Sequence, residues 1–204
     1  MPLALKQGEA QANPFAGRKN FTYNDYLNWP DDVRAEIING IAYMMSQPLT
    51  IHQRALVQLS RHFSNFLEGK SCEVFIAPFG VRLFPKEDRT DDTVLEPDLV
   101  VVCDPSKIDE HGCNGAPDLV IEILSPSTRR KDRSIKRELY QKAKVREYWI
   151  VSPDDCEVEV HIFENNTIKI YGKNENETPD DSRLSEIIPV FALPGLEIDL
   201  KRIL

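Results

Sequence analysis

A carboxylate in the middle of an apolar run is the feature that most constrains the fold of this chain. The run APDLVIEILSPST covers residues 116–128, and its Leu, Val and Ile residues predict a strand buried in a sheet. Because side chains alternate along a strand, Glu122 shares one face with Asp118 and Val120. An isolated ionised carboxylate is costly to bury, so a cation must lie beside Glu122. That cation is a metal ion, a lysine or an arginine.

A second run of the same type, EPDLVVVCD at residues 96–104, has Asp98 at the mouth of its strand. If the two strands are neighbours, Asp98 and Glu122 converge, and the loop-like stretch DPSKIDEHGCNGAP between the strands permits this. Two converging carboxylates repel each other unless a divalent cation lies between them. Oxygen ligands favour Mg²⁺, Mn²⁺ or Ca²⁺ over zinc. Each acid also has an ordinary structural interpretation, Asp98 as a turn residue and Glu122 as a solvent-facing residue of an edge strand.

A metal held by two carboxylates suits phosphodiester hydrolysis. Mg²⁺ binds one or two carboxylates and completes its coordination shell with waters and substrate phosphate. The ion activates a water, and a nearby lysine can stabilise the negative charge that develops on the phosphate. The segment that follows the first strand, RRKDRSIKRELYQKAKVR at residues 129–146, supplies candidate lysines within one or two helical turns.

The charge of the chain is unevenly distributed. The 204 residues carry a net charge of -8, but residues 129–146 hold nine Lys and Arg against two Asp and Glu. This segment therefore carries +7, and the remainder of the chain carries -15. A basic segment in an acidic protein is typical of a surface that binds phosphates, and DNA is the expected partner. The alternative is a solvated helix face with no ligand.

The pattern of apolar residues predicts one α+β domain over residues 21–204, after a flexible lead-in at residues 1–20. Helices are expected at 51–67 and 129–145, the second with Ile135, Leu139 and Ala143 on one side. Asn39-Gly40 predicts a hairpin turn between two short strands. We expect a mixed β-sheet flanked by helices. No apolar stretch approaches the roughly 20 residues of a membrane span, so no membrane association is expected.

The four cysteines show no CxxC spacing. Cys72 and Cys103 stand in apolar runs, which favours small buried hydrophobes over a disulfide framework. The interpretation that follows is a protein of the reducing cytoplasm.

Several segments in order resemble one known family. EPDLVVV, PDLVIEILSPST, the series Asp132, Lys136 and Tyr140, and VREYWIVSP resemble the Uma-type restriction endonuclease family of bacteria, within the PD-(D/E)xK nuclease superfamily. EIINGIAYMMSQP, followed by His52, resembles an upstream segment of the same family. The resemblance covers about residues 20–200, nearly the whole chain.

The resemblance implies a restriction-endonuclease-like core and a homodimer. It implies that Asp98 and Glu122 bind Mg²⁺ or Mn²⁺. It also implies that Glu36 is an acid of the first helix region that helps the metal or its waters. The superfamily pattern places a lysine two residues after Glu122, where this chain has Leu124. Lys136, on the next helix, matches that lysine.

The remaining site residues have competing interpretations. Lys136 is expected to be catalytic, the alternative being a lysine that only extends along the helix surface to water. Glu36 pairs with Arg34 or another surface base in its structural alternative. Tyr140 is expected either at the substrate or in the core. His52 is expected to be structural. Substrate contacts are expected from the start of the basic segment and from Tyr140, that is, from Arg129, Arg130, Lys131 and Tyr140.

Three functions are compatible with these residues. The first is a Mg²⁺-dependent endonuclease that hydrolyses DNA. The second is a catalytically inactive member of the same fold that binds nucleic acid or a protein, which the leucine at position 124 favours. The third is a metal-dependent hydrolase of a small phosphorylated substrate.

Overall fold

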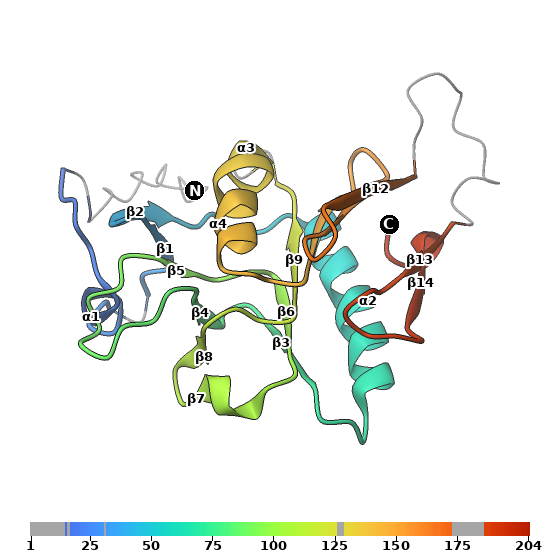
Figure 1. The fold of residues 1–204 in the computed structure, drawn as a ribbon. Helices are drawn as coiled ribbons and strands as arrows, with labels where there is room; N and C mark the ends of the chain where they lie inside the picture. Colours follow the sequence, from blue (N-terminus) through green and yellow to red (C-terminus); the bar gives the residue numbers. More distant parts are fainter. Residues whose placement is uncertain (1–14, 16, 31, 126–128, 173–185) are drawn as a thin grey trace, which may run out of the picture.

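The computed structural model describes residues 15, 17–30, 32–125, 129–172 and 186–204. Within these ranges the chain forms two six-stranded mixed sheets and a separate two-stranded sheet, with helices packed on them (Figure 1). This α+β architecture confirms the predicted fold class. No helix in the described ranges is long and apolar enough to cross a membrane.

The sheet that carries Glu122, here called the central sheet, has the strand order β12-β11-β10-β9-β6-β3. The strand β9 lies in its middle, antiparallel to β6 and parallel to β10, and all five of its residues are buried. Position at the centre of a sheet explains why its sequence is an almost continuous apolar run. The strands are β3 Glu73–Ile76, β6 Leu99–Val102, β9 Leu119–Ile123, β10 Glu147–Ser152, β11 Glu157–Ile162 and β12 Thr167–Gly172.

The second sheet has the order β2-β1-β5-β4-β8-β7 and contains the predicted hairpin. Asn39 and Gly40 both have positive φ, 49° and 75°, as a tight two-residue hairpin turn requires. The expected loop between Asp104 and Pro117 is partly wrong, because it holds two paired short strands. The strands are β1 Ala35–Ile38, β2 Ile41–Met44, β4 Gly80–Arg82, β5 Val94–Leu95, β7 Ile108–Asp109 and β8 Gly112–Asn114.

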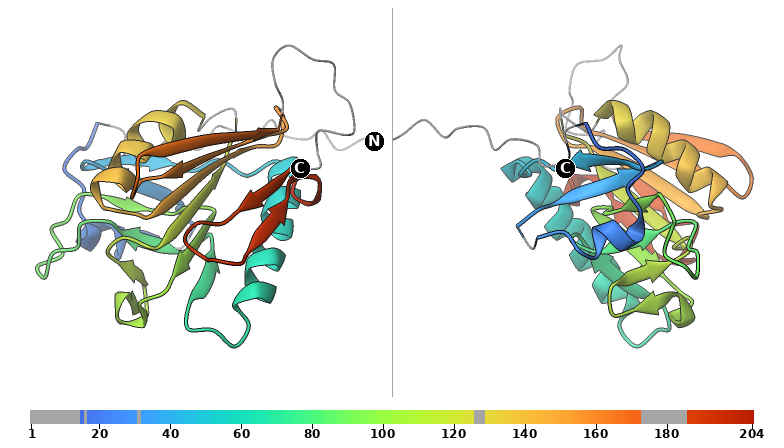
Figure 2. Two further views of the ribbon diagram at one scale, coloured as in Figure 1. Left: turned by 45° about the vertical axis from the view of Figure 1, so that its right-hand side comes forward. Right: turned by 90° about the vertical axis from the view of Figure 1, so that its left-hand side faces the viewer.

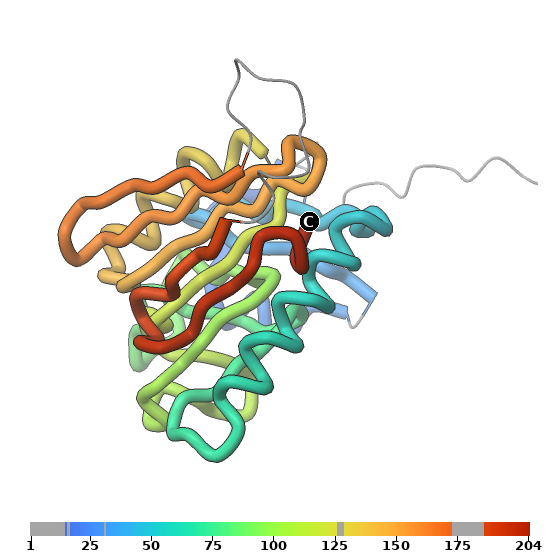
Figure 3. The backbone as a smooth tube through the Cα atoms, turned by 90° about the vertical axis from the view of Figure 1, so that its right-hand side faces the viewer, coloured from blue at the N-terminus to red at the C-terminus, as the bar shows by residue number. Residues whose placement is uncertain are grey.

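The two faces of β9 pack against different layers, as side-chain alternation predicts. Leu119, Ile121 and Ile123 pack with the long helix α2 (Thr50–Leu67) and with the hairpin β13–β14 (Ile187–Pro189 and Glu197–Asp199). Figures 2 and 3 show this red hairpin beside the teal α2 on one side of the central sheet. Val120 packs on the other side, with residues of the second sheet and of the helix after β9. Each large apolar side chain buried in these layers contributes about 1.5–3 kcal/mol.

The basic segment forms a helix that changes its winding. Arg129–Lys131 (α3) and Arg137–Lys142 (α4) are α-helical, and Asp132–Lys136 between them is a π-helical turn. A π turn contains more residues than an α turn, so it shifts the helix phase. As a result Ile135 is 38% exposed while Lys136 is buried, and the prediction that Ile135 belongs to the inward side is wrong. A short helix α1 (Tyr23–Tyr26) and two 3₁₀ turns (Pro105–Lys107 and Leu200–Arg202) complete the helical elements.

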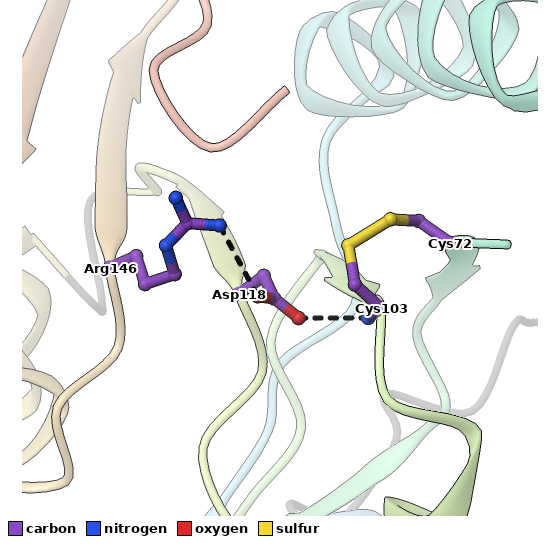
Figure 4. The surroundings of a disulfide bond; sticks show 4 residues. All are labelled: Cys72, Cys103, Asp118 and Arg146. Atoms are coloured by element: carbon purple, nitrogen blue, oxygen red, sulfur yellow. Dashed lines mark hydrogen bonds and ion pairs between the residues drawn. A yellow bond between two sulfur atoms is a disulfide. The ribbon is translucent and has the colours of Figure 1, made fainter. Parts of the chain in front are cut away.

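Cys72 and Cys103 form a disulfide, so their interpretation as unpaired hydrophobes is wrong (Figure 4). Cys72 precedes β3 and Cys103 follows β6, and the pairing of Glu73 with Val102 brings the two cysteines opposite each other. Asp118 lies beside the bridge, where it accepts a hydrogen bond from the backbone N of Cys103 at 2.8 Å. The expectation of a reducing compartment rested on unpaired cysteines here and loses that basis.

Candidate active site

A cavity of about 210 Å³ lies where the start of β6, the end of β9, β1, α2 and α3 meet. Its lining joins residues that are far apart in the sequence. The charged and ionisable side chains that line it are Glu36, Glu96, Asp98, Glu122, Arg34, Lys131, Lys136 and His52.

Asp98 and Glu122 both line this cavity, as the sequence predicted for neighbouring strands. Strands β6 and β9 are antiparallel partners, with Leu99 opposite Ile121, so the start of β6 lies beside the end of β9. Asp98 Oδ2 accepts a hydrogen bond from the backbone N of Ile123 at 2.7 Å. This bond fixes the Asp98 carboxylate next to the residue that follows Glu122.

The cation beside Glu122 is a lysine. Lys136 Nζ lies 2.8 Å from Glu122 Oε1 and 2.7 Å from Glu36 Oε1. Asp132 Oδ1 is 3.6 Å away, one π turn earlier on the same helix. The phase shift of the π turn, which moves Ile135 outward, turns Lys136 toward the strand.

Burial and charge act together on this pair. Burial alone would lower the pKa of Lys136, but the carboxylates of Glu122 and Glu36 outweigh it and raise the pKa well above its ordinary range. In this arrangement Lys136 is therefore held as an ammonium by its carboxylate neighbours. Burial raises the pKa of Glu122, and Lys136 opposes that rise.

Tyr140 holds the same oxygen of Glu122. Its hydroxyl donates to Glu122 Oε1 at 2.7 Å, so both polar contacts of Glu122 with described residues use Oε1. Tyr140 lies one helical turn after Lys136, and its side chain is entirely buried. The structure thus gives Tyr140 a role in positioning Glu122. A contact with substrate stays a prediction.

Glu36 lies on strand β1, so its expected place in a helix region is wrong. The turn at Asn39-Gly40 folds its segment into a hairpin instead. Glu36 Oε1 accepts a hydrogen bond from the backbone N of Glu96 at 3.1 Å, in addition to its ion pair with Lys136. The alternative pairing with Arg34 is not found among the described contacts, where Arg34 pairs with Glu96 at 3.2 Å.

Three charged or ionisable residues of the cavity, Arg34, His52 and Glu96, were not identified as site residues from the sequence. His52 Nε2 lies 3.2 Å from Asp98 Oδ1, and its Nδ1 is buried with no hydrogen-bond partner among the described residues. Glu96 is buried and accepts a hydrogen bond from the hydroxyl of Tyr26 at 2.8 Å. The only sequence signal for Glu96 was its position two residues before Asp98 in the same buried run.

Much of the basic segment is neutralised within the protein. Arg129 pairs with Asp155 at 2.8 Å, and Arg133 pairs with Glu157 and Glu159 on β11. Arg130 is exposed and has no ion pair with a described residue. The phosphate-binding surface expected from the sequence is therefore smaller than its count of basic residues indicates. Ser125 lines the cavity, while Ser127 and Thr128 lie outside the described residues.

The donor set of the cavity fits some metals better than others. In the described ranges no three His, Cys, Asp or Glu residues are grouped so that they could hold a metal ion. Structural zinc needs four protein ligands and catalytic zinc three, so this set does not fit zinc. Mg²⁺ and Mn²⁺ accept one or two carboxylates with water and phosphate in the remaining positions, which the carboxylates of Asp98 and Glu122 can provide.

The comparison with known families is decisive for the classification. Residues 23–200 match the family model Uma2, described as "Putative restriction endonuclease". The chain belongs to the Uma2 family. The range that matches the Uma2 model contains Glu36, Asp98, Glu122 and Lys136.

Two relatives show how far the likeness extends. The chain is 30% identical over 152 residues to "Uncharacterized protein slr1290" of Synechocystis sp. (strain ATCC 27184 / PCC 6803 / Kazusa), covering 73% of this chain and 77% of that protein. It is similar in structure to a "putative nuclease belonging to DUF820" from Anabaena variabilis ATCC 29413, with a TM-score of 0.69 and 19% identity. That match covers 90% of this chain and 97% of the other and supports the fold.

Proposed function

We propose that this Uma2-family protein is a divalent-metal-dependent endonuclease that hydrolyses phosphodiester bonds of DNA. The observation that carries the proposal is the meeting of Asp98, Glu122 and Lys136 in one cavity. The family description and the likeness to a nuclease fold support the same reaction class.

Asp98 and Glu122 are the residues that would hold Mg²⁺ or Mn²⁺. When bound, the ion supplies an activated water and offsets charge on the phosphate that is attacked. Asp98 is oriented by His52 and by the backbone N of Ile123, and Glu122 is oriented by Tyr140 and Lys136. Carboxylates fixed in this way do not have to reorganise during the reaction.

Lys136 contributes a fixed positive charge. Because its pKa is raised, it stays protonated, and its ammonium lies between Glu36 and Glu122. In this position it stabilises negative charge that develops beside the two carboxylates, and its N–H groups can orient a water.

The charges of the cavity also favour a phosphate substrate only once a dication is bound. Its lining holds four Asp and Glu side chains against three Lys and Arg side chains, an excess of acidic groups. A phosphodiester would be repelled by that excess. A divalent cation reverses the sign, so substrate binding and metal binding are expected to support each other.

Plasmid cleavage tests the proposal. Purified protein should nick or cut supercoiled DNA with Mg²⁺ or Mn²⁺ and not with EDTA. Asp98→Asn and Glu122→Gln should each lower the rate by about 100-fold or more. Glu138→Gln removes an exposed acid of α4 and serves as the matched control. Full activity of either cavity variant would refute the site assignment, and activity in EDTA would refute the metal mechanism.

A second candidate is a catalytically inactive member of the fold that binds nucleic acid or a protein. The observation that favours it is Lys136, which already supplies the cation that buried Glu122 requires. Calorimetric titration of Mn²⁺ into the wild type and Glu122→Gln distinguishes the two candidates. Binding that is lost in the variant supports the nuclease. A wild type that binds DNA but no Mn²⁺ supports the inactive protein.

The homodimer expected from the family resemblance belongs to the same proposal, since two sites are useful for cutting two strands. Light scattering of the purified protein, with and without a DNA duplex, tests it. Hydrolysis of a small phosphorylated substrate, the third function, predicts activity with little dependence on salt. A DNA enzyme predicts a steep salt dependence.

A further inference from the structure

We propose that Arg34 and Lys131 form a phosphate-binding subsite at the mouth of the cavity, for the backbone of a polynucleotide strand. This inference rests on the proposed function and specifies its substrate. It requires a strand with at least two successive phosphates, one at Asp98 and Glu122 and the next at the subsite.

The three basic residues of the cavity differ in how accessible their side chains are to a ligand. Lys136 has a side chain only 3% exposed and is surrounded by Glu36, Glu122 and Asp132. Arg34 and Lys131 have side chains that are 43% and 17% exposed. A ligand that enters from solvent therefore meets Arg34 and Lys131 before it reaches Lys136.

Arg34 is anchored on one side and open on the other. Its Nη2 lies 3.2 Å from Glu96 Oε2, and its contact with Met45 Sδ also uses Nη2. The Nε and Nη1 atoms of Arg34 have no polar contact with another described residue. A guanidinium has five N–H donors in a planar fork that matches a phosphate. Arg34 can therefore bind a phosphate while it stays paired with Glu96.

Glu96, the ion-pair partner of Arg34, is itself held in place by other contacts. Glu96 has a side chain only 6% exposed, and it accepts the hydroxyl of Tyr26 at 2.8 Å. The backbone N of Glu96 donates to Glu36 Oε1, which also contacts Lys136. Arg34 is thereby connected through two carboxylates to the cation in the centre of the cavity. Its guanidinium is positioned before a ligand arrives, which lowers the entropic cost of binding.

Lys131 approaches the same carboxylate from the helix side. Its Nζ lies 3.6 Å from Glu36 Oε2, a separation too long for a hydrogen bond, and 4.7 Å from the centre of the Tyr43 ring. The ammonium thus keeps N–H donors for a phosphate. Lys131 lies near Glu36, and Arg34 pairs with Glu96, whose backbone N donates to Glu36. A phosphate bound by both cations would therefore be adjacent to the site at Asp98 and Glu122. Contacts of this kind position a strand without reading its sequence.

Fluorescence anisotropy of a labelled DNA oligonucleotide, measured at a fixed Ca²⁺ concentration over a series of salt concentrations, tests the subsite. Arg34→Gln and Lys131→Gln should each weaken binding to several unrelated sequences alike. Each should also reduce the slope of log K against log salt by about one. Arg61→Gln, an exposed residue of α2 outside the cavity lining, is the control and should leave the slope unchanged.

A second pair of variants separates binding from folding. Arg34→Gln leaves buried Glu96 without its ion partner and can weaken the fold. The double variant Arg34→Gln/Glu96→Gln removes both charges, and it should still bind DNA weakly with the reduced salt slope. Glu96→Gln alone should bind at least as tightly as the wild type, because the guanidinium remains. If Arg34 only neutralised Glu96, the double variant would instead recover wild-type binding and slope.

Different results would overturn the proposed function and the Arg34–Lys131 subsite. A wild type that binds no DNA under any condition would overturn the proposed function and the subsite together. A wild type that binds DNA, with unchanged salt slopes in Arg34→Gln and Lys131→Gln, would overturn the subsite alone. Reduced slopes in both variants and an unchanged slope in Arg61→Gln would support it.

Discussion

Lys136 Nζ and Glu122 Oε1 lie 2.8 Å apart, although one residue stands on a helix and the other in the middle of a buried strand. The pair is almost inaccessible to solvent, so its strength depends on both partners being present.

Removing the lysine charge should therefore destabilise the fold strongly. Lys136→Met leaves Glu122, Glu36 and Asp132 buried without their common cation, and we expect a loss of about 3–5 kcal/mol in the free energy of unfolding. Urea denaturation measures it. Lys142→Met, on the exposed side of α4, should change stability by about 0.5 kcal/mol or less. An equal effect of the two substitutions would show that the buried pair is not formed.

The hydroxyl of Tyr140 offers a smaller test of the same cluster. Tyr140→Phe removes one hydrogen bond to a carboxylate and should cost about 1.5–3 kcal/mol in the free energy of unfolding. Tyr148→Phe is a matched control, because the Tyr148 hydroxyl donates to a neutral carbonyl, that of Asp132, at 3.2 Å. Its cost should be about 1 kcal/mol. A larger loss in Tyr148→Phe than in Tyr140→Phe would contradict the assignment.

Acid should weaken the contact between the basic helix and β11. The hydrogen bond from His161, together with the charges of His161 and Arg133, holds the pKa of Glu159 below its ordinary range. The unfolded chain, with a pKa of about 4.3 at this residue, then binds more protons than the folded chain. The stabilisation by Glu159 is thus complete above the unfolded pKa and is lost as the pH falls through the lower folded value.

Thermal melting between pH 7 and pH 3 measures this loss. The difference in Tm between the wild type and Glu159→Gln should shrink as the pH decreases below about 5. Glu138→Gln corrects for the general effect of removing a surface charge. A difference that stays constant or grows toward low pH would exclude a depressed pKa at Glu159.

The cysteines should react in a fixed order. Cys156 is exposed, whereas Cys113 is buried, and burial raises the pKa of its thiol to about 11. Alkylation without reductant should label Cys156 in the native protein and both Cys156 and Cys113 after unfolding in urea. Cys72 and Cys103 should react only after reduction. Mass spectrometry of the labelled peptides gives the result, and labelling of Cys72 in the unreduced protein would disprove the bridge.

The disulfide should also contribute to stability. It joins residues separated by 31 positions, and closing a loop of that length restricts the unfolded chain. Cys72→Ser/Cys103→Ser should lower the free energy of unfolding by about 2–4 kcal/mol. Cys156→Ser is the control for the loss of an exposed thiol. A double variant as stable as the wild type would mean that the bridge does not form in solution.

The strands and the long helix were predictable because their periodicity is strong. The apolar run around Glu122 and the helical spacing of α2 each follow from packing on one or two faces. The second sheet was not predicted, since β5 has only two residues and β4 and β8 have three each. Strands of that length are too short to show alternation.

Within the site, the sequence predicted that Asp98 and Glu122 converge, but not which other charged side chains they meet. The prediction that a cation lies beside Glu122 was correct, but the sequence left open whether this cation is a metal ion, a lysine or an arginine. The π turn that directs Lys136 inward has no sequence signal of its own. The pairing of Arg34 with Glu96 depends on β1 and β5 being neighbours, which local patterns do not encode.

The place of Lys136 on a helix has a consequence for how such proteins are found. Leu124, two residues after Glu122, is buried in the same apolar cluster as Tyr140, while the ammonium beside Glu122 comes from residue 136 on the next helix. A sequence search that requires a lysine at a fixed short interval after the strand glutamate would pass over this protein. Relatives of this kind are recognised by the contact between the strand carboxylate and the lysine ammonium in the folded protein, whatever the number of residues between them.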